Sequence, residues 1–201
     1  IIKSKLNETS EDKIAGFVGD LINMESSYIF KEFFERTLNT KNYESRSSNN
    51  FVNTNERENY LFNSSINGIE ESDLILLIGT NPRFEATILN ARIRKTFVNN
   101  STKIISLNDV GDLTYPYESL DSKTKTILDI FEGNNEVSKK ILDSKKPLII
   151  LGDSFYKLQS AELLFNLIKE FLKKNNKINN EWNSLNTLAT DASTVGSLDL
   201  K

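Results

Sequence analysis

The sequence predicts an α/β fold with a mostly parallel sheet that helices cover on both faces. The first observation is a pair of apolar runs, Leu74–Ile78 and Pro147–Leu151. Each is too short for a helix core and too continuous for a half-exposed strand. The second is that a glycine and then a helical pattern follow each run, at Gly79 and Gly152. Strands that alternate with helices form parallel crossovers, so we expect residues 1–201 to form a single α/β domain.

A strand and a helix are predicted near the start of the chain. Residues 13–18 favour a first strand that ends at Gly19 and Asp20, and Asn23 is expected to cap the helix that follows. That helix carries apolar side chains at helical spacing, which we expect to pack in the core: Ile29, Phe30, Phe33, Phe34 and Leu38.

A polar, aperiodic stretch over residues 39–59 predicts a long surface loop, which Phe51 and Val52 pin to the body. A short helix over residues 65–71 is expected to lead into the first buried run. After this run, residues 82–98 predict a helix. Four of its residues are expected to lie on one side, namely Phe84, Ile88, Ala91 and Lys95, and Leu89 and Ile93 are expected to flank that side.

The second half of the chain repeats the alternation. We expect a strand at Lys103–Leu107, a loop over residues 108–119, and helices over residues 123–131 and 136–142. Residues 159–174 predict an amphipathic helix with an apolar stripe of Leu163, Leu164, Leu167, Ile168, Phe171 and Leu172. A last helix is predicted over residues 181–191, around Trp182, Leu185 and Leu188, before an irregular tail through Gly196.

Composition excludes several kinds of chemistry. The chain has 201 residues, a net charge of −3, no cysteine and no histidine. It therefore has no thiolate for an iron–sulfur cluster, no imidazole base and no Cys or His zinc ligand. The net charge gives no indication of nucleic-acid binding, and no stretch has the length of a membrane span. We expect no catalytic residue and no metal ligand. If the chain were an enzyme instead, it would have to use Asp, Lys or Tyr chemistry. The richness in Asn, Lys and Ile is typical of an AT-rich, organellar coding sequence.

The turn after the first buried run is the main candidate ligand site. Gly79, Thr80 and Asn81 could present backbone N–H groups to an anion, with Asn81 capping a helix whose first residue is Pro82. The turn contains one glycine and lacks both the GxGxxG and the GxxxxGK[ST] patterns. It is therefore also consistent with a plain, well-capped strand–helix turn. Gly152 is the matching candidate after the second run.

Charged clusters supply weaker candidates. Arg92, Arg94 and Lys95 could contact a phosphate or an acidic neighbouring subunit, or could form an ordinary solvated face. Arg83 and Glu85 favour a salt bridge or a partner contact over catalysis.

Loop and strand-end residues leave further alternatives open. Tyr115, Pro116 and Tyr117 could anchor an interface or fold back on the body. Lys145 and Lys146 are expected to be solvated. Ser154 has no histidine base, so we interpret Asp153 and Ser154 as a helix cap.

Five segments in order carry a family resemblance. The most specific runs from residue 73 to residue 95 and reads DLILLIGTNPRFEATILNARIRK. The others are residues 59–73, 112–118, 145–152 and 181–188. Together they resemble the C-terminal region of the large iron–sulfur subunit of respiratory complex I, the NADH-quinone oxidoreductase. That region is similar to molybdopterin-dependent oxidoreductases such as formate dehydrogenase, in a form without molybdenum.

The resemblance implies a cofactor-free scaffold domain in the peripheral electron-transfer arm of mitochondrial complex I, on the matrix side of the inner membrane. Gly79, Thr80, Asn81 and Gly152 would be vestiges of a pterin cradle. Iron–sulfur clusters and FMN are expected in partner subunits, among them the cluster-bearing N-terminal half of the same subunit. Because that half is absent from this sequence, either the gene is split or the chain is part of a longer one. No nucleic acid and no direct membrane insertion are expected. The alternative is an independent nucleotide- or pterin-binding α/β module.

Overall fold

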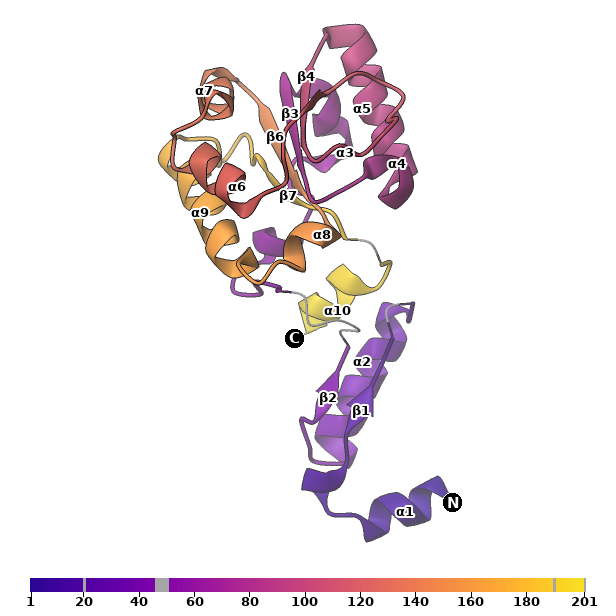
Figure 1. Cartoon of the computed structure of the whole chain (residues 1–201). Helices are drawn as coiled ribbons and strands as arrows, with labels where there is room; N and C mark the ends of the chain where they lie inside the picture. Colours follow the sequence, from indigo (N-terminus) through magenta and orange to yellow (C-terminus); the bar gives the residue numbers. More distant parts are fainter. Residues whose placement is uncertain (20, 46–50, 190, 201) are drawn as a thin grey trace. The chain divides into compact units, whose positions relative to one another are not determined.

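The computed structural model describes residues 1–19, 21–45, 51–189 and 191–200. The chain divides into two compact units, each described below by itself (Figure 1). The smaller unit is Ile1–Asn49 with Asp191–Lys201, and the larger unit is Asn50–Thr190. The single α/β domain expected over residues 1–201 stays a prediction.

The larger unit is built on a five-stranded parallel sheet, which confirms the predicted fold class. The strand order is β5-β4-β3-β6-β7, and every neighbouring pair is parallel. β3 is central, and its first residue, Leu74, pairs with Lys103 on one side and Pro147 on the other. The strands are β3 (Leu74–Ile78), β4 (Lys103–Leu107), β5 (Glu118–Ser119), β6 (Pro147–Leu151) and β7 (Leu185–Thr187).

Helices cover both faces of this sheet, as predicted. Alternate residues of β3 point to opposite layers, because side chains of a strand alternate between its faces. Leu76 packs with the layer of α6 and α9, and Leu77 with the layer of α5. One layer holds α3 (Ser65–Gly68), the 3-10 turn η4 (Ile69–Glu71), α4 (Pro82–Glu85) and α5 (Thr87–Asn100). The other holds α6 (Thr124–Phe131), α7 (Glu136–Asp143), α8 (Asp153–Tyr156) and α9 (Ala161–Lys174) (Figure 1).

The end of the polar stretch predicted over residues 39–59 belongs to the larger unit, from Phe51 onward. Phe51 is pinned as expected: its N–H donates to the Tyr156 carbonyl at 3.1 Å, and its ring lies 5.9 Å from that of Phe165. The 3-10 turn η3 (Arg57–Tyr60) follows, and residues 46–50 of the stretch lie outside the described residues.

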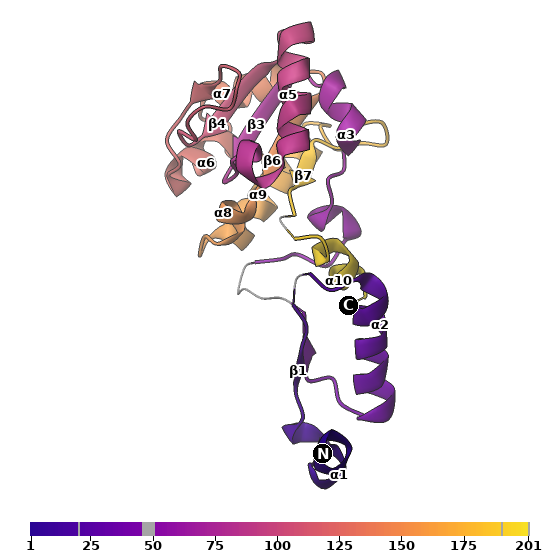
Figure 2. The ribbon, with the colours of Figure 1, turned by 90° about the vertical axis from the view of Figure 1, so that its right-hand side faces the viewer.

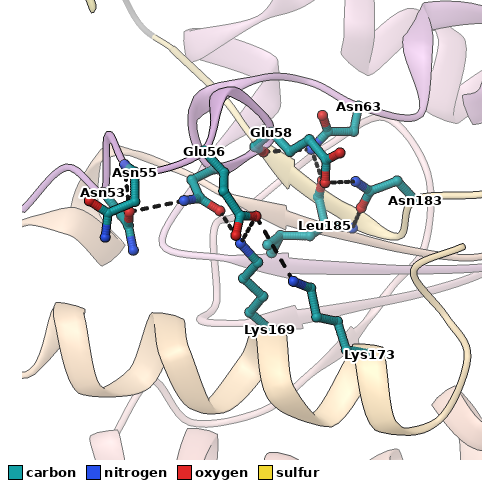
Figure 3. Close-up of polar contacts among 10 residues, drawn as sticks. Asn53, Asn55, Glu56, Glu58, Asn63, Lys169, Lys173, Asn183 and Leu185 are labelled. Carbon is teal, nitrogen blue, oxygen red and sulfur yellow. Dashed lines mark hydrogen bonds and ion pairs between the residues drawn. The ribbon is translucent and has the colours of Figure 1, made fainter.

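A lysine on α9 holds this stretch in place. Figure 3 shows Lys169 reaching from α9 to Glu56, at 2.6 Å from its Oε2 atom. The same ammonium donates to Asn59 Oδ1 at 2.6 Å. Asn63 adds a hydrogen bond of 2.7 Å to the Leu185 carbonyl, so the stretch is also attached to β7. These bonds fix the path of the chain into α3.

The smaller unit contains a two-stranded parallel sheet and one long helix. β1 (Gly16–Phe17) pairs with β2 (Tyr43–Glu44), so the strand predicted over residues 13–18 is shorter than expected and belongs to a sheet of its own. Asp20, its expected end, lies outside the described residues. The other elements are α1 (Ile2–Glu8), η1 (Glu11–Lys13), α2 (Met24–Glu32), the π turn η2 (Phe33–Thr37) and α10 (Thr194–Leu200).

Two predictions for the C-terminal segment are wrong. The helix expected over residues 181–191 is instead β7, because the free edge of β6 offers this segment backbone partners that spacing alone does not reveal. Ile149 N–H donates to the Ser184 carbonyl at 2.8 Å, and Leu188 N–H to the Leu151 carbonyl at 2.9 Å. The tail expected to be irregular contains α10.

The apolar stripes are only partly buried. Asn23 caps α2 as predicted, accepting from Ser26 N–H at 2.8 Å, and Phe34 is buried. Ile29, by contrast, is 66% exposed and Phe33 40% exposed, so the core prediction is wrong for them. Leu163 of α9 is likewise exposed.

The helix predicted over residues 82–98 is interrupted. Ala86 has φ −152° and ψ 71°, which separates α4 from α5. Leu89 and Ile93, expected only to flank the apolar side, are the buried residues. The side that begins with Phe84 and Ile88 faces solvent instead.

Candidate functional site

The two glycine turns meet at the carboxyl edge of β3 and β6. Gly79 has φ +64°, a conformation that favours glycine. Gly152 N–H donates to the Ile78 carbonyl at 3.0 Å, and Ser154 N–H donates to the Gly79 carbonyl at 3.1 Å. The two turns are therefore hydrogen-bonded to each other.

Neither glycine has room for a side chain. A Cβ at Gly79 would lie 2.3 Å from the backbone nitrogen of Phe155. A Cβ at Gly152 would lie 2.4 Å from the Thr80 Cβ and 2.6 Å from the Gly79 carbonyl oxygen. The glycines thus allow one turn to pack against the other, which is a sufficient physical reason for both.

The Glu85 carboxylate occupies the polar side of the first turn. Thr80 Oγ1 donates to its Oε2 at 2.7 Å, and Asn81 N–H donates to its Oε1 at 2.8 Å. Thr80 is buried. A protein carboxylate therefore takes the Asn81 N–H, one of the backbone donors that the sequence offered to an anionic ligand, together with the Thr80 hydroxyl. The sequence carried only a weak signal for this contact, because Glu85 lies four residues after Asn81, one position beyond the residue that completes a capping box.

The helices that follow the turns are short. Asn81 caps α4 as predicted, with its Oδ1 accepting from Arg83 N–H at 3.2 Å, and Pro82 is the first helical residue. The Nδ2 atom of Asn81 donates to the Val110 carbonyl at 3.0 Å. Both α4 and α8 contain four residues, so each adds only a small helix dipole at this edge.

Asp153 and Ser154 do not form the predicted cap. Gly152 is the N-cap residue of α8, and Asp153 and Ser154 are its first two helical residues. The Asp153 carboxylate forms an ion pair with Lys157, and this hydrogen bond raises the pKa of Lys157.

The basic cluster on α5 is divided by a single acidic side chain. Glu70 binds Lys95 at 2.8 Å and also pairs with Arg92. The hydrogen bonds from Lys95 and Arg92 lower the pKa of Glu70. Arg94 is exposed. Two of the three cations are therefore paired with an acidic side chain of the same chain.

Arg83 forms the predicted salt bridge. Its guanidinium binds the Asp112 carboxylate at 2.6 Å and the Asp112 carbonyl at 2.6 Å. The Asp112 pKa is lowered by the Thr114 backbone N–H and then by Arg83.

The loop tyrosines fold back on the body. Tyr115 is buried, and its hydroxyl donates to Asn90 Oδ1 at 2.7 Å. Burial raises its pKa. Tyr117 donates to Asp109 Oδ1 at 2.9 Å and to the Gly111 carbonyl at 3.0 Å. Both hydroxyls thus hold the loop after β4.

At the opposite edge of the sheet, Asp73 forms a clamp that the sequence did not predict. Its carboxylate accepts from the Lys145 N–H at 2.8 Å, the Lys146 N–H at 3.0 Å and the Ser144 hydroxyl. Burial opposes its ionisation, yet these three hydrogen bonds together hold the pKa of Asp73 below its usual value. The Lys146 side chain pairs with Glu71 and lies 5.2 Å from the Trp182 ring, so it is not simply solvated.

The residues that the structure describes contain no group of three or more Asp or Glu side chains arranged to hold a metal ion. Within the same ranges, no helix is both long and apolar enough to cross a bilayer.

Comparison with known proteins identifies the family. A family model described as "Molybdopterin oxidoreductase" matches residues 1–201. The chain is 37% identical, over 100% of its length, to the NADH-ubiquinone oxidoreductase 75 kDa subunit of Reclinomonas americana. It is 36% identical, over 98% of its length, to the mitochondrial NADH-ubiquinone oxidoreductase 78 kDa subunit of Candida albicans. It is also 30% identical, over 100% of its length, to the mitochondrial NADH dehydrogenase (ubiquinone) iron–sulfur protein 1 of Solanum tuberosum.

The chain covers 31%, 27% and 27% of these three relatives, respectively. It belongs to the molybdopterin oxidoreductase family, and the resemblance to the large complex I subunit is confirmed.

Proposed function

From this family membership we propose that the chain is a structural, cofactor-free domain of the large iron–sulfur subunit of mitochondrial complex I. In this role it supports the peripheral electron-transfer arm on the matrix side of the inner membrane. Its partners are other peripheral-arm subunits, including the part of the same subunit that bears the iron–sulfur clusters. The clusters and FMN belong to those partners. The names of the relatives support the assignment to NADH:ubiquinone oxidoreductase.

The observation that supports the absence of a cofactor is that groups of the chain itself accept hydrogen bonds from donors of both glycine turns. Glu85 takes the donors of Thr80 and Asn81, and the Gly79 carbonyl takes Ser154 N–H. A pterin or nucleotide phosphate would have to displace a carboxylate that already satisfies these groups, and would then lie beside its negative charge. The space beside Gly79 and beside Gly152 is occupied by atoms of the facing turn. These residues do not fit a pterin cofactor, so we derive no reaction step through one.

Isolation of the native complex tests the assignment. Respiratory complexes separated on a native gel and stained for NADH dehydrogenase activity should contain this chain in the active band. Mass spectrometry of the band would identify it beside the cluster-bearing subunits. A chain absent from the band, and recovered elsewhere at its own mass, would refute the role in complex I.

Calorimetry tests the cofactor-free part separately. The 201-residue chain should give no heat of binding with NADH, ATP or molybdopterin guanine dinucleotide. Tight binding of any of the three would instead favour an independent nucleotide- or pterin-binding module. The Glu85→Ala variant is the matched comparison, because it frees the donors of Thr80 and Asn81. Binding to this variant alone would show that Glu85 blocks the cradle.

A further inference from the structure

An apolar stripe lies on the outer side of α4 and α5. Phe84 is 81% exposed, Ile88 is 74% exposed and Val98 is 68% exposed, and the exposed Ala91 and Lys95 lie between the last two. From Ile88 to Val98 the successive spacings are three, four and three residues, which places these side chains on one helix face with Lys95 as its one charged member. Figure 2 shows α5 from the side, in front of the sheet. The stripe therefore extends along most of a 14-residue helix, about 21 Å.

The stripe is not an unfinished part of the unit's own core. The opposite side of α5 is fully used: Leu89 and Ile93 are buried against β3 and β4, and Thr96 donates to the Ile69 carbonyl at 3.2 Å. Rotating the helix to bury the stripe would expose those residues instead. Large apolar side chains that line one outer face in this way are typical of a protein-binding surface.

The charge around the stripe selects the kind of partner. α5 spans Thr87–Asn100 and contains no acidic residue but three basic ones. Glu70 pairs with Arg92 and Lys95, whereas Arg94 has no hydrogen bond or ion pair with any residue that the structure describes. The face next to the stripe is therefore positive on a chain whose net charge is −3.

A second copy of the chain does not complement this face. Two such stripes packed together would bring the three cations of each copy near those of the other, with a single carboxylate per copy, that of Glu70, to offset them. An acidic partner removes this repulsion. A helix is the partner element whose apolar ridge matches a stripe with this spacing.

We propose that the outer face of α4 and α5 binds an amphipathic helix of another polypeptide, with apolar residues at three- and four-residue spacing against Phe84, Ile88 and Val98, and a carboxylate against Arg94. This inference goes beyond the proposed function and does not rest on it.

Single introduced cysteines test whether a partner covers the apolar stripe, because the chain has no cysteine of its own. In native extracts of cells that express the full chain, the thiol of Ile88→Cys should react with maleimide far more slowly than after denaturation. Leu163→Cys is the matched control, since Leu163 is an exposed apolar residue of α9, on the other side of the sheet. Equal native reactivity at both positions would overturn the proposal.

Cross-linking tests the chemistry of the partner. Benzophenone maleimide on the thiol of Ile88→Cys should capture a segment of a different polypeptide that contains Asp or Glu and has apolar residues at helical spacing. Arg94→Glu should reduce the cross-link severalfold, and Arg94→Lys should retain it. Capture of a second copy, of lipid or of nothing, or an equal yield from both Arg94 variants, would refute the proposal.

Discussion

The two compact units build their sheets from the same kind of parallel pairing but bury them differently. In the larger unit, every residue of β3 and β6 is buried between two helical layers. In the smaller unit, β1 and β2 have two residues each, and neither contains a buried residue. The buried apolar residues of the smaller unit, within the described ranges, are Ile14, Phe34 and Leu198. Its stability must therefore come from far less apolar burial.

The helices α9 and α2 differ in the same way, in how completely their apolar side chains are buried. α9 buries Leu164, Phe165, Ile168 and Leu172 completely, because it packs on a wide sheet face. α2 and the adjoining η2 also carry apolar side chains at helical spacing but pack on two short strands, so Ile29 and Phe33 remain exposed. A helical pattern predicts the helix, whereas burial depends on the area of the surface that meets it.

The largest expected effect comes from emptying the larger core. Phe165→Ala removes a completely buried ring from α9 and should lower the free energy of unfolding by about 3–5 kcal/mol. Phe17→Ala, at an exposed ring of β1, should change it by about 0.5 kcal/mol or less. Urea unfolding followed by circular dichroism measures both. Equal losses would contradict the difference between the units.

A glycine in each unit gives the next comparison. Gly79→Ala places a Cβ against the Phe155 backbone at positive φ and should cost about 1–2 kcal/mol for the backbone conformation and about 1–3 kcal/mol for the overlap. Gly16→Ala meets only the ring tips of Phe30 and Phe34, at 2.5 and 2.2 Å, and ring tips can shift. Thermal unfolding should therefore rank Gly79→Ala as the more destabilised variant. The reverse order would mean that the smaller unit is the more tightly packed.

Carboxylate acceptors provide a smaller effect. Glu85→Ala leaves the buried Thr80 hydroxyl and the Asn81 N–H without their acceptor and should cost about 1–3 kcal/mol. Glu35→Ala in the smaller unit removes one bond, from the Tyr43 hydroxyl at 2.6 Å, and should cost less. Chemical denaturation of the two variants decides the order. A larger loss for Glu35→Ala would count against the role assigned to Glu85.

The smallest effect is on the pH dependence of stability. The pKa of Asp73 is lowered in the folded chain, so its unfolded form binds the proton first as the pH falls. Its contribution is therefore complete above an unfolded pKa of about 3.9 and is lost as the pH falls through the lower folded value. Asp73→Asn should flatten the fall in stability below about pH 4. An unchanged profile, measured by denaturation at a series of acidic pH values, would show that the clamp does not need its charge.

Much of the larger unit could be predicted from the sequence. β3, β6 and the turn at Gly79 are local features, since an apolar run, a glycine and an Asn-Pro cap each act within a few residues. β7 could not be predicted, because its strand conformation depends on bonds to β6 from more than thirty residues earlier in the chain. The candidate turn was correctly located, but the contacts of its donors with Glu85 require the folded loop.

The sequence by itself determined the alternation of strands and helices, the absence of thiol and imidazole chemistry, and the family. These depend on composition and on short-range order along the chain. Only the tertiary structure decided that Glu85 accepts from Thr80 and Asn81, that Asp73 binds the loop before β6 at the opposite end of the strands, and that Phe84 and Ile88 face outward. Each of these depends on which surfaces meet, and a helical or strand period does not specify the partner of a face.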